Sequence, residues 1–258
     1  MKIIVVANQK GGVGKTTTSL SLVSLLKKDG YRVLLVDADP QGNASDTYGA
    51  QIEGAATLFD VLLEKPATPA AEAIQHCAMG DIIASDPLLL RADSELGDLD
   101  GLFRMKEAFE EAKLDYDYVV IDTAPALNRL LHNCLVAADY VVVPATPDRY
   151  AMQGLGQLHD TITTISKRYN PRLELMGVLL IKYDKRKNLS KAASEQLKSS
   201  AEKELGTSVF GREIRECVKC GEAQARKVHL IDYAPDCTTA QDYTEFYREL
   251  IEKITKEG

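Results

Sequence analysis

The stretch Lys10–Thr17 (KGGVGKTT) has the residue types and the spacing needed to hold the phosphates of a nucleotide. Its glycines let the backbone turn tightly and aim N–H groups inward, and the start of a following helix adds positive dipole. In this motif the lysine reaches the β and γ phosphates and the next hydroxyl ligates Mg²⁺. The predicted nucleotide-binding residues are Gly11, Gly12, Val13, Gly14, Lys15, Thr16 and Thr17, with Lys15 for the phosphates and Thr16 for the metal.

The motif departs from the general phosphate-loop pattern at its first position. That pattern begins with a glycine where this chain has Gln9, and an additional lysine, Lys10, follows directly. The loop is therefore of a deviant kind, with a second cation close to the phosphates.

Three carboxylates follow apolar runs that have the pattern of strands. Asp122 ends the run YVVID, and Asp37 and Asp39 end the run RVLLVDAD. In open α/β sheets, ligands bind beyond the carboxyl ends of the strands, so we expect these side chains to converge on the phosphate loop. A carboxylate there can hold Mg²⁺, directly or through water.

The elements that position these residues alternate between short apolar runs and longer helical patterns. The runs are typical of parallel strands covered on both faces, and amphipathic helices with apolar spacings of three and four lie between them. This alternation predicts a single doubly wound α/β domain over residues 1–258, with a mostly parallel sheet. The expected strands are Lys2–Ala7, Arg32–Val36, Tyr118–Ile121, Tyr140–Val143 and Leu175–Ile181.

Composition and charge exclude several classes of protein. The chain has 258 residues, with 45% hydrophobic and 27% charged residues, which is ordinary for a globular protein. Its net charge of −7 means that any contact with nucleic acid needs a local basic patch. No apolar run approaches the roughly 18 residues that span a bilayer, and the first strand leaves no room for a signal peptide. With five scattered cysteines, we expect a cytoplasmic protein without a disulfide framework.

Successive motifs of the chain resemble those of the ParA/Soj partition ATPases, a branch of the deviant Walker A group of P-loop NTPases that also includes MinD and the nitrogenase iron protein. The similarity is distributed from Met1 to about Ser190 and continues more weakly to the end. The motifs that carry it are KGGVGKTTT, DADPQGNAS, VVIDTAP, VVVPATPDRYAMQGLGQL and GVLLIKYDKRKNLS.

The resemblance implies a Mg²⁺-dependent ATPase, with ATP and Mg²⁺ as cofactors, that dimerises face to face around two nucleotides. In that family a lysine at the place of Lys10 crosses to the partner's nucleotide. Asp39 would position the attacking water, Asp37 would support the metal side, and Asp122 would be the Walker B residue. These roles fit phosphoryl transfer, which depends mainly on positioning and charge neutralisation. The implied catalytic residues are thus Lys10, Lys15 and Asp39.

The family's biology implies ATP-driven DNA segregation. The dimer would bind double-stranded DNA non-specifically on the nucleoid, and a ParB-like partner would stimulate hydrolysis. Nothing precedes the first strand, so we expect no N-terminal DNA-reading extension and no sequence-specific operator binding. The chain departs from the family in DTAPALNRL, and in Lys182, which stands where a threonine near the adenine is usual.

A basic segment, Lys182–Lys191, carries five basic residues against one acidic residue in this acidic chain. Such clustering can hold a phosphate backbone without reading bases, although a charge run is also typical of a solvated surface. By the resemblance, Arg186 has the place of a DNA-binding arginine, and Lys219 lies in a second such loop, with Glu216 where an arginine is common. The predicted DNA-binding residues are Lys182, Lys185, Arg186, Lys187 and Lys219.

Two alternatives remain open. Cys217 and Cys220 form a Cys-x-x-Cys pair, and a symmetric dimer could supply the four thiolates of an iron–sulfur cluster or a zinc site, as in related cluster-carrier ATPases. Cys77, Cys134 and Cys237 have no spacing that indicates chemistry. The helix predicted near 239–256 could instead be a MinD-like membrane anchor, but its polar face is acidic, which anionic lipids would repel.

Overall fold

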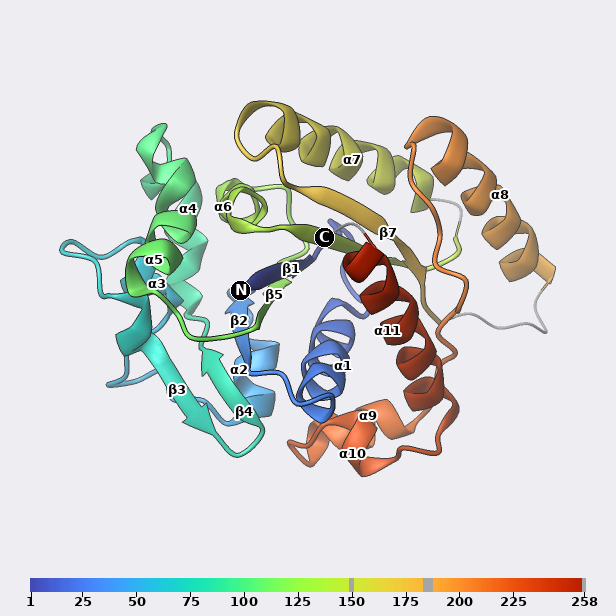
Figure 1. Cartoon of the computed structure of the whole chain (residues 1–258), viewed down its shortest axis with the longest axis horizontal. Coiled ribbons are helices and arrows are strands. Elements are labelled where there is room, and N and C mark those ends of the chain that lie inside the picture. Colours follow the sequence, from blue (N-terminus) through green and yellow to red (C-terminus); the bar gives the residue numbers. More distant parts are fainter. Residues whose placement is uncertain (149–150, 183–187, 257–258) are drawn as a thin grey trace.

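The computed structural model describes residues 1–148, 151–182 and 188–256. Its strands and helices alternate along the chain, as the apolar patterns predict (Figure 1). The strands are β1 (Lys2–Val6), β2 (Val33–Ala38), β3 (Ile74–Cys77), β4 (Gly80–Ile83), β5 (Tyr118–Thr123), β6 (Tyr140–Ala145) and β7 (Glu174–Leu180). The longer helices are α1 (Lys15–Lys28), α5 (Arg104–Ala112), α6 (Arg129–Ala137), α7 (Ala151–Arg168), α8 (Asn188–Glu204) and α11 (Thr238–Lys256).

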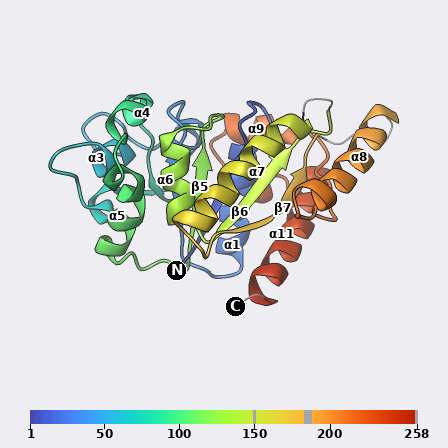
Figure 2. The same cartoon turned by 90° about the horizontal axis from the view of Figure 1, so that it is seen from above.

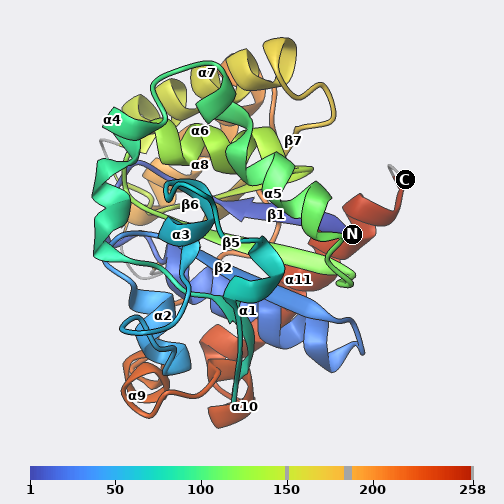
Figure 3. The same ribbon diagram turned by 90° about the vertical axis from the view of Figure 1, so that its left-hand side faces the viewer.

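Shorter helical segments connect these elements. The α-helical ones are α2 (Asn43–Tyr48), α3 (Leu58–Leu62), α4 (Ala92–Glu95), α9 (Lys219–Ala225) and α10 (Leu230–Tyr233). Three 3₁₀ turns, η1 (Ala70–Ala73), η2 (Pro87–Arg91) and η3 (Asp100–Phe103), complete the set. Figure 3 shows α9 and α10 next to α2, and an ion pair between Lys227 and Asp46 joins the two regions.

All seven strands form one sheet in the order β3-β4-β2-β5-β1-β6-β7. Every pairing is parallel except that of β3 with β4. The expectation of a mostly parallel, doubly wound sheet is therefore confirmed. The sequence pattern does not reveal the β3–β4 hairpin, because β3 is short and has no fully buried residue.

Successive residues of a strand point to opposite faces of the sheet, and here both faces are covered. Ile3 and Val5 pack into a core with α5, α6 and α7, whereas Ile4 and Val6 pack into a second core with α1 and α11. Figures 1 and 2 show these two helical layers, and Figures 2 and 3 place both termini on the same side of the molecule.

Parallel pairing also sets which residues meet at the carboxyl edge of the sheet. Strands β2, β5 and β6 each run two residues beyond the predicted apolar runs, because backbone pairing continues past those runs. Strands β1 and β7 instead end one residue before the predicted runs. Asp37 lies opposite Asp122, and Ala38 lies opposite Thr123. The segments that follow β1, β2, β5, β6 and β7 therefore all emerge at one edge.

The C-terminal helix buries its apolar face inside the molecule. Tyr243, Phe246, Tyr247, Leu250 and Ile254 of α11 are at most 4% exposed and belong to the core shared with α1. This face is therefore not available to lipid in this structure. Within the described ranges, no helix combines the length and the apolar character that a membrane span requires.

Candidate active site

The phosphate loop follows β1 and is held by side-chain contacts to the neighbouring strands. The amide of Asn8 donates to the carbonyl of Pro144 at 2.8 Å, and its oxygen accepts from the backbone N–H of Lys10 at 2.9 Å. Gly12 and Gly14 both have a φ of 71°, a left-handed conformation that glycine adopts without strain. Helix α1 begins directly after Gly14, so its free N–H groups face the loop.

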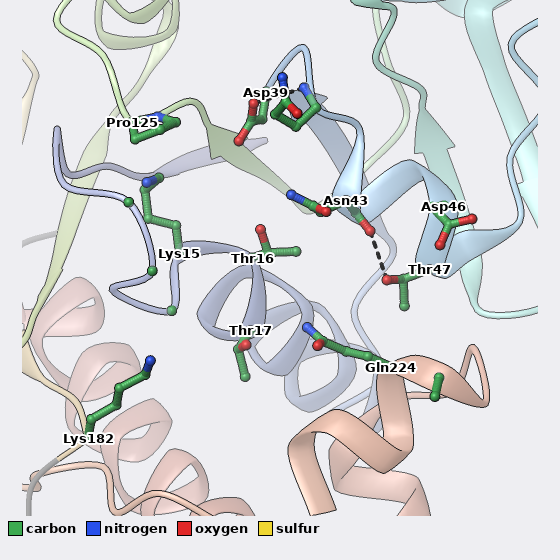
Figure 4. Close-up of a pocket in the computed structure, with 15 residues that line it drawn as sticks. Lys15, Thr16, Thr17, Asp39, Asn43, Asp46, Thr47, Pro125, Lys182 and Gln224 are labelled. Carbon is green, nitrogen blue, oxygen red and sulfur yellow. Dashed lines mark hydrogen bonds between the residues drawn. The ribbon is translucent and has the colours of Figure 1, made fainter. Parts of the chain in front are cut away.

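A cavity of about 610 Å³ opens over this loop (Figure 4). Lys15, Thr16 and Thr17 line one side, and Asp39 lies across from them at the end of β2. Lys182 and Gln224 close it from the C-terminal part of the chain. The remaining lining residues are Gly11, Gly12, Gly14, Gln41, Asn43, Asp46, Thr47, Pro125 and Ala225. Val13, by contrast, is buried in the core and is not among the residues that line the cavity.

Lys15 lies at the floor of the cavity and is only 7% exposed. Its Nζ donates to the carbonyl of Lys10 at 3.2 Å. Burial lowers the pKa of the Lys15 amine, while the nearby carboxylates of Asp122 and Asp39 act in the opposite direction. A buried cation at this position is well placed to neutralise the charge of a phosphate.

Thr16, Ser19 and Asp122 form a buried oxygen cluster below the cavity. The hydroxyl of Thr16 donates to one carboxylate oxygen of Asp122 at 2.7 Å, and that of Ser19 to the other at 3.1 Å. Burial, and then the charge of Asp37, raises the pKa of the Asp122 carboxyl.

Hard oxygen donors of this kind suit Mg²⁺, which usually keeps several waters and takes further ligands from substrate phosphates. The described residues include no group of three or more His, Cys, Asp or Glu that could hold a metal by themselves. This donor set therefore fits an ion that Thr16 and Asp122 share with a nucleotide.

Asp37 and Asp39 have different surroundings, although both were expected at the site. Asp37 is fully buried, and both its oxygens are engaged by the loop that follows: one accepts from the N–H and the hydroxyl of Ser45, both at 2.8 Å, and the other from the N–H of Asp39 at 3.1 Å. Burial raises the pKa of its carboxyl. Asp39 instead lines the cavity, where one oxygen accepts from the N–H of Gln41 at 3.0 Å. Asp37 thus shapes the loop that presents Asp39.

Lys10 is not among the residues that line the cavity above the phosphate loop. Its side chain is turned toward the segment after β6 instead. Its Nζ forms an ion pair with Asp148 and lies 3.4 Å from the hydroxyl of Thr146, both of which follow β6. Thr146 in turn donates to Asp148 at 2.6 Å.

The predicted DNA-binding residues fall in three places. Lys182 is exposed and lines the phosphate cavity, so its position also suits contact with a nucleotide. Lys219 forms an ion pair with Glu222 at 2.8 Å, and the neighbouring Glu216 is exposed. The other three, Lys185, Arg186 and Lys187, lie outside the described residues.

A second cavity, of about 400 Å³, adjoins the first and shares Gly14, Thr17 and Lys182 with it. Its opposite side comes mainly from residues 214–237, here called the C-terminal wall, which contributes mainly apolar groups and the half-buried Cys217 and Cys220. Tyr243 closes the floor, and its hydroxyl lies 3.0 Å from that of Thr18 in α1.

Sequence reasoning missed three residues that support the site. Ser19 and Ser45 engage Asp122 and Asp37, and Asp148 engages Lys10. Ser19 follows Thr16 by three residues on the same helix, so helical periodicity could have placed it on the same face. Asp148 is 138 residues from Lys10, and no local pattern joins them.

The sequence similarity to known proteins extends over nearly the whole chain. Residues 1–175 match a family model described as an AAA domain. The chromosome partitioning protein ParA of Caulobacter vibrioides is 38% identical over 258 residues, which cover 98% of this chain and 95% of that protein. The sporulation initiation inhibitor protein Soj of Bacillus subtilis is 37% identical over 255 residues, covering 96% and 98%.

The fold is also shared with solved structures. Cobyrinic acid a,c-diamide synthase from Mycobacterium smegmatis, crystallised with a bound ATP analog and magnesium, is similar with a TM-score of 0.84 and 28% identity, covering 100% of this chain and 97% of that one. The sequence relatives, the shared fold and the deviant phosphate loop agree with one another. The chain therefore belongs to the ParA/Soj family of partition ATPases.

Proposed function

We propose that this protein is an ATP-driven DNA segregation ATPase that acts in the cytoplasm on the nucleoid. In this proposal, two copies enclose two molecules of Mg-ATP, bind double-stranded DNA without regard to sequence, and hydrolyse ATP when a ParB-like partner stimulates them. Support comes from the partitioning proteins that are 37–38% identical over almost the whole chain.

The two adjoining cavities suit the two ends of a nucleotide. The polar cavity over the phosphate loop offers Lys15 and the free N–H groups at the start of α1 to the phosphates. The apolar cavity beside it offers Ile181, Ile214 and Tyr243 to a flat base. Because the cavities share Gly14 and Thr17, one ligand can occupy both.

The chemistry follows from the side chains that line the phosphate cavity. Bound Mg²⁺ would supply charge neutralisation at the phosphates, and Thr16 and Asp122 are the residues that would hold it. Lys15 would neutralise the transferred phosphoryl group. Asp39, whose carboxylate faces the cavity, would orient the attacking water, so hydrolysis needs no covalent step on the protein.

One observation carries the proposal of a nucleotide-sandwich dimer: Lys10 lies outside the cavity formed by its own loop. Its ion pair with Asp148 is half exposed on both sides, and such surface pairs contribute little to stability. Lys10 can therefore leave Asp148 at small cost when a second nucleotide approaches. A lysine delivered in this way makes catalysis depend on dimerisation.

DNA binding would rest mainly on the basic segment Lys182–Lys191. The charge of Lys219 is partly neutralised by Glu222, so Lys219 would contribute less. A dimer presents the segment twice, and each phosphate neutralised adds about 0.9 to the slope of log affinity against log salt. DNA binding should therefore appear with ATP and be nearly lost with ADP.

Two measurements test the proposal. In sizing experiments with ATP, Lys10→Ala should bind nucleotide but fail to form stable dimers, whereas Lys15→Ala should lose nucleotide binding itself.

In salt titrations with two unrelated duplexes, Arg186→Glu should abolish DNA binding and Lys219→Glu should only weaken it. Lys106→Glu on α5 is the control for the same change of charge. Normal dimers and turnover by Lys10→Ala, or equal DNA binding with ATP and ADP, would contradict the proposal.

A further inference from the structure

Three of the five cysteines lie in the same region, where the C-terminal wall joins helix α11. Cys217 precedes α9, Cys220 lies in α9, and Cys237 comes directly before α11. The side chains of Cys217 and Cys237 interact with each other, and Cys220 lies close enough to both to interact electrostatically. The fold thus brings together cysteines that are 20 residues apart in the sequence.

The two backbone segments that carry Cys217 and Cys237 are fastened to each other. The hydroxyl of Thr239 donates to the carbonyl of Arg215 at 2.6 Å, and the N–H of Arg215 donates to the Asp242 carboxylate at 3.0 Å. These contacts lie within two residues of Cys217 on one side and span the first turns of α11 on the other. The fold therefore holds the backbone segments that carry the two cysteines against each other.

Backbone donors also orient each sulfur. The sulfur of Cys217 accepts from the N–H of Lys219 at 3.3 Å, and that of Cys237 accepts from the N–H of Ala240 at 3.4 Å. The donor at Cys237 favours its thiolate, which is the reactive form of cysteine. Both residues are half-buried and free, unlike the fully buried Cys134. Cys217 also lines the apolar cavity, so a small reagent can reach it.

We propose that Cys217 and Cys237 form a reversible disulfide site, oxidised by low-molecular-weight disulfides, that controls the apolar cavity beside the phosphate loop. The thiolate of Cys217 attacks one sulfur of glutathione disulfide and releases one glutathione thiolate. The thiolate of Cys237 then attacks the sulfur of Cys217 and releases the second glutathione thiolate. The two protons lost by the protein protonate these leaving groups, so one protein dithiol is oxidised while glutathione disulfide is reduced to two thiols.

Disulfide formation must move the cavity wall. A disulfide holds its two sulfurs about 2.05 Å apart, which is much closer than two sulfurs that are not bonded can approach. Because the start of α11 is anchored in the core through Tyr243, Cys217 and the exposed Val218 would move toward α11. The effect on nucleotide binding rests on the proposed function, since it requires the base to occupy this cavity.

Burial also predicts how fast the site reacts. It raises the pKa of the Cys237 thiol, so the second exchange step should be slow at neutral pH and faster at alkaline pH. A site of this kind responds to sustained oxidation and leaves the protein reduced under ordinary cytoplasmic conditions.

The first test maps the disulfide after treatment with glutathione disulfide. Trypsin cleaves after Arg215, Lys219 and Lys227, so each cysteine of the cluster falls on its own peptide. We expect a non-reduced peptide pair that joins Cys217 to Cys237, in the wild type and in the control Cys77→Ser. Cys237→Ser should keep a mixed disulfide with glutathione at Cys217. A Cys217–Cys220 disulfide, or no cross-link, would overturn the proposal.

The second test measures binding of a fluorescent ATP analogue before and after oxidation. Cross-linked wild-type protein should bind about tenfold more weakly, the equivalent of about 1.4 kcal/mol, and dithiothreitol should restore the affinity. Cys77→Ser should respond in the same way, and Cys237→Ser should not. If the reduced protein binds no nucleotide, the proposed function fails. If the reduced and the cross-linked protein bind equally well, the control of the cavity is wrong while the proposed function stands.

Discussion

The phosphate loop and the C-terminal wall face the same two cavities, but different forces hold them. The loop is fixed by buried polar contacts to the central strands, such as those of Asn8 with Pro144 and Thr16 with Asp122. The wall is attached by side-chain contacts that reach the surface, such as those of the partly exposed Arg215 with Asp242 and of Lys227 with the exposed Asp46. The nucleotide site therefore combines one rigid side with one side that can be adjusted.

The largest expected effect tests the rigid side. Replacing Asp39 with alanine removes the carboxylate that would orient water but leaves the phosphate loop and Thr16 intact. We expect hydrolysis to fall by about 10²- to 10⁴-fold, while ATP binding and dimerisation persist. Steady-state phosphate release and sizing with ATP measure both properties.

The control for this variant is Asp46→Ala, which removes a carboxylate from the exposed rim of the same cavity. Its effect should stay within about threefold, as is usual for a surface substitution. Equal losses in the two variants would mean that Asp39 acts only through its charge.

The next effect concerns the attachment of the C-terminal wall. Asp242 is 1% exposed and accepts from Arg215 through its backbone N–H, Nε and Nη2 at 3.0, 2.8 and 2.7 Å. Asp242→Ala should lower the free energy of unfolding by about 1–3 kcal/mol, because it removes the buried partner of three Arg215 donors, and the partly exposed guanidinium can bind water instead. Urea unfolding measures this, and the control Glu245→Ala removes only an exposed partner of Arg212. Equal losses of unfolding free energy in Asp242→Ala and Glu245→Ala would show that contacts other than those of Asp242 hold the wall.

A smaller, pH-dependent effect tests the other end of the wall. His229 is buried, donates from Nε2 to the Met79 carbonyl at 3.2 Å, and packs edge-on against Tyr48. Burial lowers its pKa in the folded state, with Lys27 acting in the same direction and Asp232 against it.

The sign of the pH dependence follows from this shift. Above the unfolded-state pKa of about 6.5, His229 is neutral in both states and contributes nothing to the pH dependence. As the pH falls below that value, the unfolded chain takes up a proton that the folded chain resists, so stability is lost. His229→Gln should flatten this decline in urea unfolding between pH 7.5 and 5.5, and the exposed control His76→Gln should not. If the unfolding free energy of His229→Gln declines with pH as steeply as that of the wild type, protonation of His229 does not cause the loss of stability.

The same contrast explains how much of the molecule could be predicted from the sequence. The loop and its strands are local patterns, so Lys15, Thr16 and the five parallel strands around the site could be predicted, whereas the β3–β4 hairpin could not. Asp37 was expected near the metal, but only the structure shows that Ser45 occupies one of its oxygens. Cys237 had no informative spacing, because its nearness to Cys217 arises from tertiary packing.

The smallest expected effect is at the boundary between the two regions, where Asp148 holds Lys10. Asp148→Asn removes the charge that competes for Lys10, and its amide oxygen can still accept from Thr146. Exposed ion pairs contribute about 0.2–1 kcal/mol, so ATP-dependent dimers should become about two- to fivefold tighter in sedimentation experiments. The same substitution in a Lys10→Ala background should change nothing, because a double-mutant cycle isolates the pair. Weaker dimers in Asp148→Asn would instead place this carboxylate in the dimer contact itself, and the rigid side of the site would then extend to the end of β6.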